Sequence, residues 1–90
     1  MNEQIVIQQL ADVVYNYRGK SLLTSEYKIL LGMLQDQTYE EIAQSVNYYP
    51  SYVNDLAREM MKIFSCHFRF NVKKKNFVFF CETYLAQSKI

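Results

Sequence analysis

Turn-forming residues are scarce in this sequence, which has two glycines, one proline and no tryptophan among its 90 residues. Because glycine and proline dominate turns, their scarcity favours helices with short connections over a turn-rich β fold. No apolar run approaches the roughly 20 residues that cross a bilayer. The chain opens at Met1-Asn2-Glu3 without a basic region or an apolar export segment. We therefore expect a soluble, cytoplasmic protein with no membrane partner.

An excess of charge of either sign is also missing. Ten Lys and Arg residues against nine Asp and Glu residues leave a formal net charge of +1. A nucleic-acid binder normally carries an obvious positive excess, so the whole-chain charge argues against that role.

Residues that commonly carry catalysis or bind metals are few. Two cysteines and one histidine fall short of the four ligands of a structural zinc site. Cys66 and His67 are adjacent, so on a helix they diverge by roughly 100° and do not make a thiolate–imidazole pair. We expect no metal, no cofactor, no small-molecule substrate and no enzymatic activity.

Aromatic bulk is what the sequence has instead, with eight Tyr and six Phe residues. A chain of this size buries only about 60% of the surface that its unfolded form exposes, so its core must be dense. We expect one domain over residues 1–90. Cys66 and Cys81 are expected to be reduced thiols buried as small hydrophobes, although two cysteines also permit one disulfide.

Two helices are predicted in the first part of the chain. The first runs from Asn2 to Tyr17 and ends at Gly19, which suits a left-handed C-cap, with Arg18 near the negative end of the helix dipole. Its expected buried face is Val6, Leu10, Val13, Val14 and Tyr17. The second is capped by Thr24 or Ser25 and closes near Gln35-Asp36. Its first turn contains Glu26, and its expected buried stripe is Ile29, Leu30, Met33 and Leu34.

The segment from Leu23 to Phe64 is typical of a helix-turn-helix. A hydroxyl cap and two first-turn carboxylates for a short third helix come from residues 37–43 (QTYEEIA). Asn47 can take the positive φ of a sharp turn, and Pro50 suits the first position of a fourth helix. The expected inward residues are Ile42, Ala43 and Val46, followed by Val53, Leu56, Ala57, Met60, Ile63 and Phe64.

The tail permits two assignments. Phe68, Phe70 and Val72 alternate with polar residues as in a strand, whereas Phe77, Phe80, Cys81, Tyr84 and Leu85 fall at helical spacing. We favour a fifth helix from Lys74 to Gln87, and a two-stranded wing is the alternative. The predicted fold class is all-α, with a three-helix helix-turn-helix core flanked by an N-terminal helix and a C-terminal helix or short wing.

A family resemblance rests on residues 37–43, Tyr48, Pro50, Tyr52, Lys62, Ser65 and residues 74–77 (KKNF). With these residues, the chain from Gly19 to its end resembles the N-terminal helix-turn-helix domain of bacterial vWA-MoxR-associated proteins. More loosely, Leu23 to Phe64 looks like the DNA-binding domain of LuxR-type regulators and the promoter-reading region of sigma factors. The resemblance implies a module that is usually attached to an effector, such as a signalling ATPase.

The chain departs from the pattern of that family at several positions. The family favours glycine at the positions of Asn47 and Arg69, and serine at the position of Tyr49. The usual hydroxyl cap of the fourth helix is therefore absent here.

Duplex DNA is the leading partner hypothesis. The outer face of the fourth helix can reach bases and phosphates, and residues 69–75 form a concentrated positive patch. Asp55 and Glu59 lie on the same helix and are expected to repel phosphate. A homodimer is a further hypothesis, because two-fold pairing doubles the contact with DNA. The candidate DNA-binding residues are Ser51, Tyr52, Asn54, Arg58, Lys62, Arg69, Lys73, Lys74 and Lys75.

A protein-interaction module that recruits or tethers an effector is the alternative hypothesis. Tyr39, Tyr48, Tyr49 and Tyr52 are expected to cluster around the turn, and tyrosine is enriched at protein interfaces. The candidate interface residues are Tyr48, Tyr49, Tyr52 and Asp55. A third interpretation is that the charges of the fourth helix only solvate its outer face.

Overall fold

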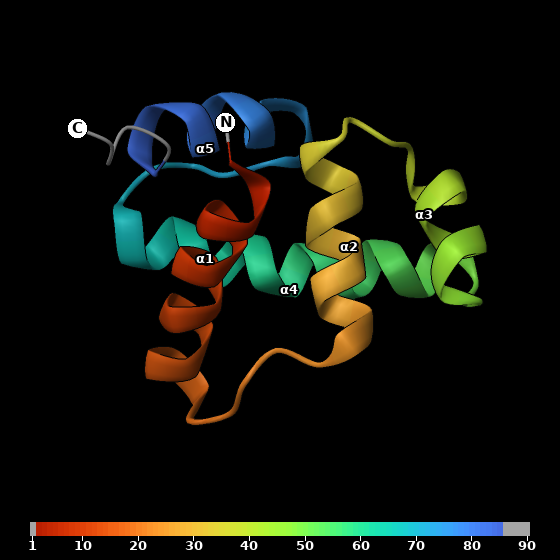
Figure 1. Cartoon of the computed structure of the whole chain (residues 1–90), viewed down its shortest axis with the longest axis horizontal. Helices are drawn as coiled ribbons and strands as arrows, with labels where there is room; N and C mark the ends of the chain where they lie inside the picture. The colour runs from red at the N-terminus through yellow and green to blue at the C-terminus, as the bar shows by residue number, and fades with distance from the viewer. Residues whose placement is uncertain (1, 86–90) are drawn as a thin grey trace.

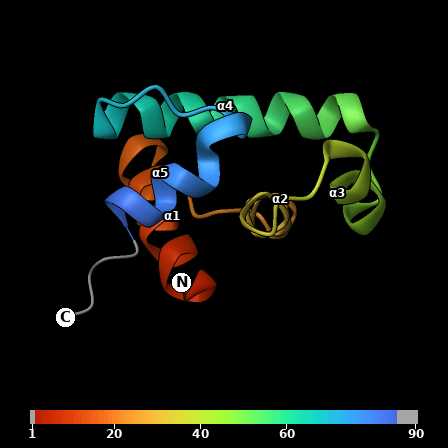
Figure 2. The same cartoon turned by 90° about the horizontal axis from the view of Figure 1, so that it is seen from above.

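The computed structural model describes residues 2–85, and in that range it contains five α-helices and no strand. They are α1 (Glu3–Arg18), α2 (Thr24–Leu34), α3 (Tyr39–Val46), α4 (Pro50–Phe68) and α5 (Phe77–Tyr84), with a 3-10 turn, η1 (Lys74–Asn76), directly before α5. In Figure 1, α4 runs along the molecule and α1 and α2 cross it. Figure 2 shows α1, α2, α3 and α5 on one side of α4.

This architecture confirms the all-α prediction and shows that the wing is wrong. Residues 74–84 form helical turns because Phe77, Phe80 and Cys81 bury one helical face against the rest of the core. The fifth helix begins as a 3-10 turn at Lys74, as expected, and its predicted end at Gln87 lies outside the described residues.

The buried face of α1 follows the prediction except at its end. Val6, Leu10, Val13 and Val14 are buried, but Tyr17 is 66% exposed. Tyr17 lines a hollow together with Ile63, Cys66 and His67 of α4, and these residues cover only part of its side chain.

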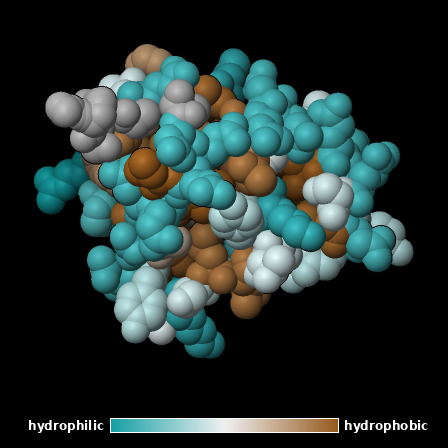
Figure 3. All heavy atoms as spheres, viewed as in Figure 1, coloured by the Kyte–Doolittle hydropathy of each residue, from teal (hydrophilic) through white to brown (hydrophobic). Residues whose placement is uncertain are grey.

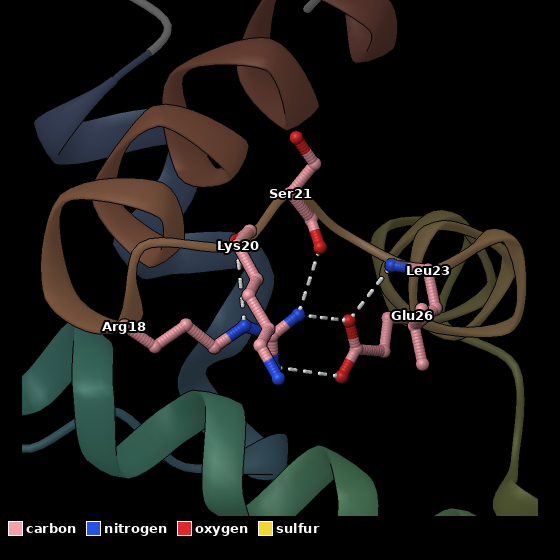
Figure 4. A network of polar contacts seen from close by, with 5 residues as sticks. All are labelled: Arg18, Lys20, Ser21, Leu23 and Glu26. Atoms are coloured by element: carbon pink, nitrogen blue, oxygen red, sulfur yellow. Dashed lines mark hydrogen bonds and ion pairs between the residues drawn. The ribbon is translucent and has the colours of Figure 1, made fainter.

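Arg18 joins the end of α1 to the start of α2 (Figure 4). Its guanidinium donates two hydrogen bonds to the carboxylate of Glu26, at 2.6 and 3.0 Å. It also donates to the carbonyl oxygens of residues 20 and 21, at 3.4 and 3.0 Å. A planar guanidinium is suited to this paired geometry, and the four bonds fix the connector between the two helices.

The Glu26 side chain also caps the first turn of α2, and this corrects the predicted cap. The carboxylate accepts a hydrogen bond of 2.9 Å from the amide of Leu23, and Leu23 rather than Thr24 or Ser25 is the N-cap residue. Burial raises the pKa of the Glu26 carboxyl, but the bonds from Arg18 and from the Leu23 amide more than offset burial and leave the pKa below its ordinary value.

The sharp turn between α3 and α4 forms by the predicted local rules. Thr38 Oγ1 accepts a hydrogen bond from the Glu41 amide at 3.1 Å, and the Glu41 carboxylate accepts one from the Thr38 amide at 2.9 Å. Asn47 is left-handed, with φ 62° and ψ 42°, and Pro50 is the first residue of α4. Tyr49 is the N-cap of α4 and makes no side-chain capping bond, as expected.

Close packing holds the three core helices together. Ile42, Ala43 and Val53 are buried where α3 meets α4. Gly32 on α2 lies so near α3 that a Cβ at this position would stand 2.6 Å from Ile42 Cγ1. The absence of a side chain at Gly32 therefore sets the distance between α2 and α3, a constraint that the sequence pattern does not reveal.

The two cysteines differ in environment, although both are free thiols. Cys81 is buried as expected, whereas Cys66 is exposed. Cys66 follows the buried Phe64 by two positions, which is roughly 200° around a helix, so the two side chains point in nearly opposite directions.

Candidate nucleic-acid interface

A groove of about 500 Å³ lies between α4 and the segment that follows it. We call it the basic groove, and its lining residues are Tyr39, Arg58, Met61, Lys62, Ser65, Asn71, Val72, Lys73 and Lys74. Four of these described residues carry a positive charge and none is an aspartate or a glutamate. The positive charge that is diluted over the whole chain is therefore concentrated here.

The segment after α4 returns beside the helix that it leaves, as Figure 1 shows. Arg69 ends α4 in the left-handed conformation, with φ 54°. The amide of Val72 then donates a hydrogen bond of 2.8 Å to Ser65 Oγ on α4. This reversal places Lys73 and Lys74 opposite Arg58 and Lys62 across the basic groove.

Asn76 gives the returning segment its local shape. Its Oδ1 accepts a hydrogen bond of 2.8 Å from the Lys73 amide, and its Nδ2 donates one of 3.0 Å to the Asn71 carbonyl. A single side chain thus closes the backbone on both sides of Val72. The conformation that presents the two lysines is fixed by these bonds and not by the lysines themselves.

Tyr39, the first residue of α3, lies in the same groove. The Lys74 ammonium stands 5.5 Å from the centre of the Tyr39 ring, a cation–π distance. Burial raises the pKa of the Tyr39 phenol, and the charge of Arg58 opposes this rise. Tyr39 therefore lies between positive charges on two elements, Arg58 of α4 and Lys74 of η1.

Glu59 of α4 is less opposed to anion binding than the sequence suggested. Hydrogen bonding to Glu26 raises the pKa of Arg18, burial opposes this, and the charge of Glu59 adds to the rise. Glu59 thus acts on Arg18 at the end of α1. Arg58, its neighbour, is turned by roughly 100° around the helix and lines the basic groove.

The structure brings some of the predicted DNA-binding residues together and leaves others apart. Arg58, Lys62, Lys73 and Lys74 line the basic groove. Ser51, Tyr52 and Asn54 lie in the first turns of α4, while Arg69 and Lys75 are exposed but do not line the groove.

Three polar lining residues were not among the predicted DNA contacts, namely Tyr39, Ser65 and Asn71. Ser65 could have been found, because it follows Arg58 by two helical turns and Lys62 by three residues, and these spacings share one face. Tyr39 and Asn71 carry no such signal, since they come from other elements that only the tertiary structure brings close.

A second groove, of about 710 Å³, follows the turn between α3 and α4. Tyr48, Tyr49 and Tyr52 line it and define what we call the tyrosine turn. The Tyr48 and Tyr52 rings pack edge to face with centroids 4.9 Å apart, and Tyr49 is 81% exposed. Tyr39 was expected in this cluster, but it lines the basic groove at the other end of α3.

Polar and apolar features alternate over the surface. On the face shown in Figure 3, hydrophilic residues separate several apolar patches. Such mixing is ordinary for the surface of a folded protein and does not by itself mark an interface. Within residues 2–85, no helix combines the length and the hydropathy needed to cross a membrane.

Comparison with known proteins gives one finding. Neither the curated proteins nor the solved structures contain a significant match to this chain. The family model described as "vWA-MoxR associated protein N-terminal HTH" matches residues 1–84, which is nearly the whole chain, and its helix-turn-helix agrees with the α3–α4 corner. The chain therefore belongs to the family of N-terminal helix-turn-helix domains of vWA-MoxR-associated proteins.

Proposed function

We propose that this helix-turn-helix domain is a non-enzymatic module that binds duplex DNA, with α4 and the basic groove as its contact surface. The observation that carries the proposal is the convergence of Arg58, Lys62, Lys73 and Lys74 on one groove without a lining carboxylate. DNA affinity depends chiefly on neutralising phosphates, so local charge matters more than the whole-chain value of +1.

In this proposal the first turns of α4 contact bases, and the residues that follow along the helix contact phosphates. Ser51 and Asn54, in the first turns, are short polar side chains of the kind that bond base edges or nearby phosphates. Arg58 and Lys62 follow along the helix and lead into the basic groove, where the backbone of one strand is held. The phosphate contacts position the helix, and few side chains remain to read sequence.

Anisotropy of a fluorescent duplex tests the proposal, measured at about 50 mM and about 200 mM salt. Four phosphate contacts predict a loss of about 100-fold in affinity between these conditions. The matched variants are Arg58→Gln with Lys62→Gln in the groove, and Lys20→Gln with Lys28→Gln outside it. The groove pair should weaken binding and the outside pair should not. No anisotropy change at the lower salt would remove the DNA hypothesis.

Protein docking through the tyrosine turn is a second candidate. The exposure of Tyr49, at 81%, and the apolar groove beside Tyr48 and Tyr52 favour it, because exposed tyrosines commonly anchor protein interfaces. In this proposal the turn holds an effector and the module tethers it.

Replacing Tyr49 and Tyr52 together by serine tests the docking role. Both side chains are exposed, so the fold should survive, and a circular dichroism spectrum checks this. A pull-down from native lysate should then lose proteins that the parent chain retains. The same set of bound proteins with both variants would count against docking through this surface.

A further inference from the structure

We propose that the basic groove is a binding site for phosphate groups that is built into the fold. The phosphate comes either from a DNA strand, in which case the site rests on the proposed function, or from a small phosphorylated ligand, in which case it does not. The two sources share one recognition chemistry, which the lining residues specify.

Cationic side chains line the groove on two sides. Arg58 and Lys62 belong to α4, and Lys73 and Lys74 belong to the segment that returns beside it. An oxyanion between the walls gains charge-assisted hydrogen bonds from both sides, which a row of lysines on one helix does not provide. Arginine adds a planar fork of donors that matches phosphate geometry.

Neutral donors complete the site. Ser65 Oγ accepts the bond from the Val72 amide, and no residue in the described part of the chain accepts a bond from the Ser65 hydroxyl. Since a hydroxyl donates as well as accepts, its hydrogen is available to an oxygen in the groove that it lines. The phenol of Tyr39, which also lines the groove, is a second donor.

The site is preorganised before any ligand arrives. Ser65 and Asn76 hold the backbone that carries Lys73 and Lys74, through bonds of 2.8 to 3.0 Å. Binding therefore does not have to order this segment, which reduces its entropic cost.

Aromatic stacking is not what the groove offers. Tyr39 is its one lining aromatic among the described residues, and the Lys74 ammonium occupies a face of that ring. A nucleobase would compete with a charged group that is already in place. The volume of about 500 Å³ instead leaves room for more than one phosphate, such as two consecutive strand phosphates or a diphosphate.

Titration with inorganic pyrophosphate tests the site, followed by amide chemical shifts with chloride keeping the ionic strength constant. Saturable shifts should be confined to residues 58–65 of α4 and to residues 71–75. The variant Lys73→Gln with Lys74→Gln should weaken binding about tenfold. The variant Lys20→Gln with Lys28→Gln removes equal charge outside the groove and should leave the affinity unchanged. The same spectra report whether each variant is folded.

Shifts that do not saturate, or that spread evenly over all exposed cations, would overturn the site. Equal weakening by the two double variants would overturn it too, because a diffuse ion atmosphere depends on total charge and not on position.

Labelled duplex DNA in a second titration distinguishes the sources. If pyrophosphate displaces the duplex, the groove holds strand phosphates. If pyrophosphate saturates the groove while no duplex binds at low salt, the site stands with a small phosphorylated ligand and the proposed function fails. If the duplex binds and neither titrant shifts the groove amides, the site is refuted while DNA binding stands.

Discussion

The ammonium of Lys74 lies over the ring of Tyr39, 5.5 Å from its centre, and this contact joins the turn before α5 to the start of α3. The candidate interface therefore includes more than the two helices of the motif. The connector between α4 and α5 forms one wall of the basic groove, so the C-terminal part of the domain contributes charge as well as core. Changes near η1 should consequently affect binding without disturbing the α3–α4 corner.

Gly32→Ala should destabilise the domain. The new Cβ would stand 2.6 Å from Ile42 Cγ1 and 2.9 Å from Gln37 Oε1, so α2 and α3 must separate. We expect a net loss of about 1 to 2 kcal/mol in the free energy of unfolding, because overpacking outweighs the better helix propensity of alanine. Urea unfolding measures this loss of stability.

Combined with Ile42→Ala, the Gly32→Ala substitution should cost less than the sum of the two single changes. Strict additivity would show that the two helices do not meet as described.

Arg69→Gly should stabilise the domain. Arg69 has φ 54°, a conformation that glycine adopts without the steric cost borne by other residues. A gain of about 1 kcal/mol is expected in thermal or urea unfolding. Arg69→Ala is the matched control, since it removes the same charge but retains a Cβ, and it should give no gain. Equal effects of both substitutions would assign the change to charge instead of to the backbone.

Glu26→Gln should make stability less dependent on acid pH. The pKa of Glu26 is lowered in the folded state, so its contribution is complete above the unfolded-state pKa of about 4.5 and is lost as pH falls through the folded-state pKa. At pH near 7 the substitution should cost about 2 to 3 kcal/mol, because Arg18 loses its charged partner. Urea unfolding over a pH series shows the two curves converging in acid. Glu82→Gln, at an exposed position, should follow the parent curve.

Converging curves are the diagnostic feature of that series. A constant gap between the parent chain and Glu26→Gln down to the lowest pH would contradict the ionised Arg18–Glu26 pair. It would leave Glu26 with only a packing role.

The two thiols should react at very different rates with iodoacetamide. Cys66 is exposed, whereas Cys81 is fully buried, and burial, helped by the charge of Glu82, raises its pKa to about 12. We expect mass spectrometry of the native domain to show one modified cysteine, Cys66. In Cys66→Ser, labelling should require denaturant. Rapid native labelling of Cys81 would mean that α5 opens readily from the core.

Local rules account for the parts of the fold that the sequence predicts. The Thr38–Glu41 capping pair, the left-handed Asn47 and the C-cap at Gly19 each depend on residues within a few positions of one another. Periodicity likewise predicts the buried faces, and it errs at Tyr17 because a pattern does not report how much of a side chain the neighbouring helix covers.

Long-range packing accounts for what the sequence does not predict. The cap of α2 depends on the Glu26 carboxylate, which Arg18 also binds. Glu26 therefore makes the capping hydrogen bond that was predicted for the hydroxyl of Thr24 or Ser25. The basic groove needs the reversal at Arg69 and the bond from Val72 to Ser65, neither of which has a short-range signal. All four cationic residues that line the groove were nevertheless among the predicted contacts, because a sequence shows which residues are charged even where it does not show their arrangement.

The salt dependence of duplex binding tests the central claim most directly. Plotted as log affinity against log salt concentration, each phosphate contact contributes a slope of about −0.9. Lys73→Gln with Lys74→Gln should make the slope shallower by about 2, while Lys20→Gln with Lys28→Gln should leave it unchanged. Identical slopes for the parent chain and the groove variant, or no binding at low salt, would contradict the assignment of the basic groove as the DNA contact.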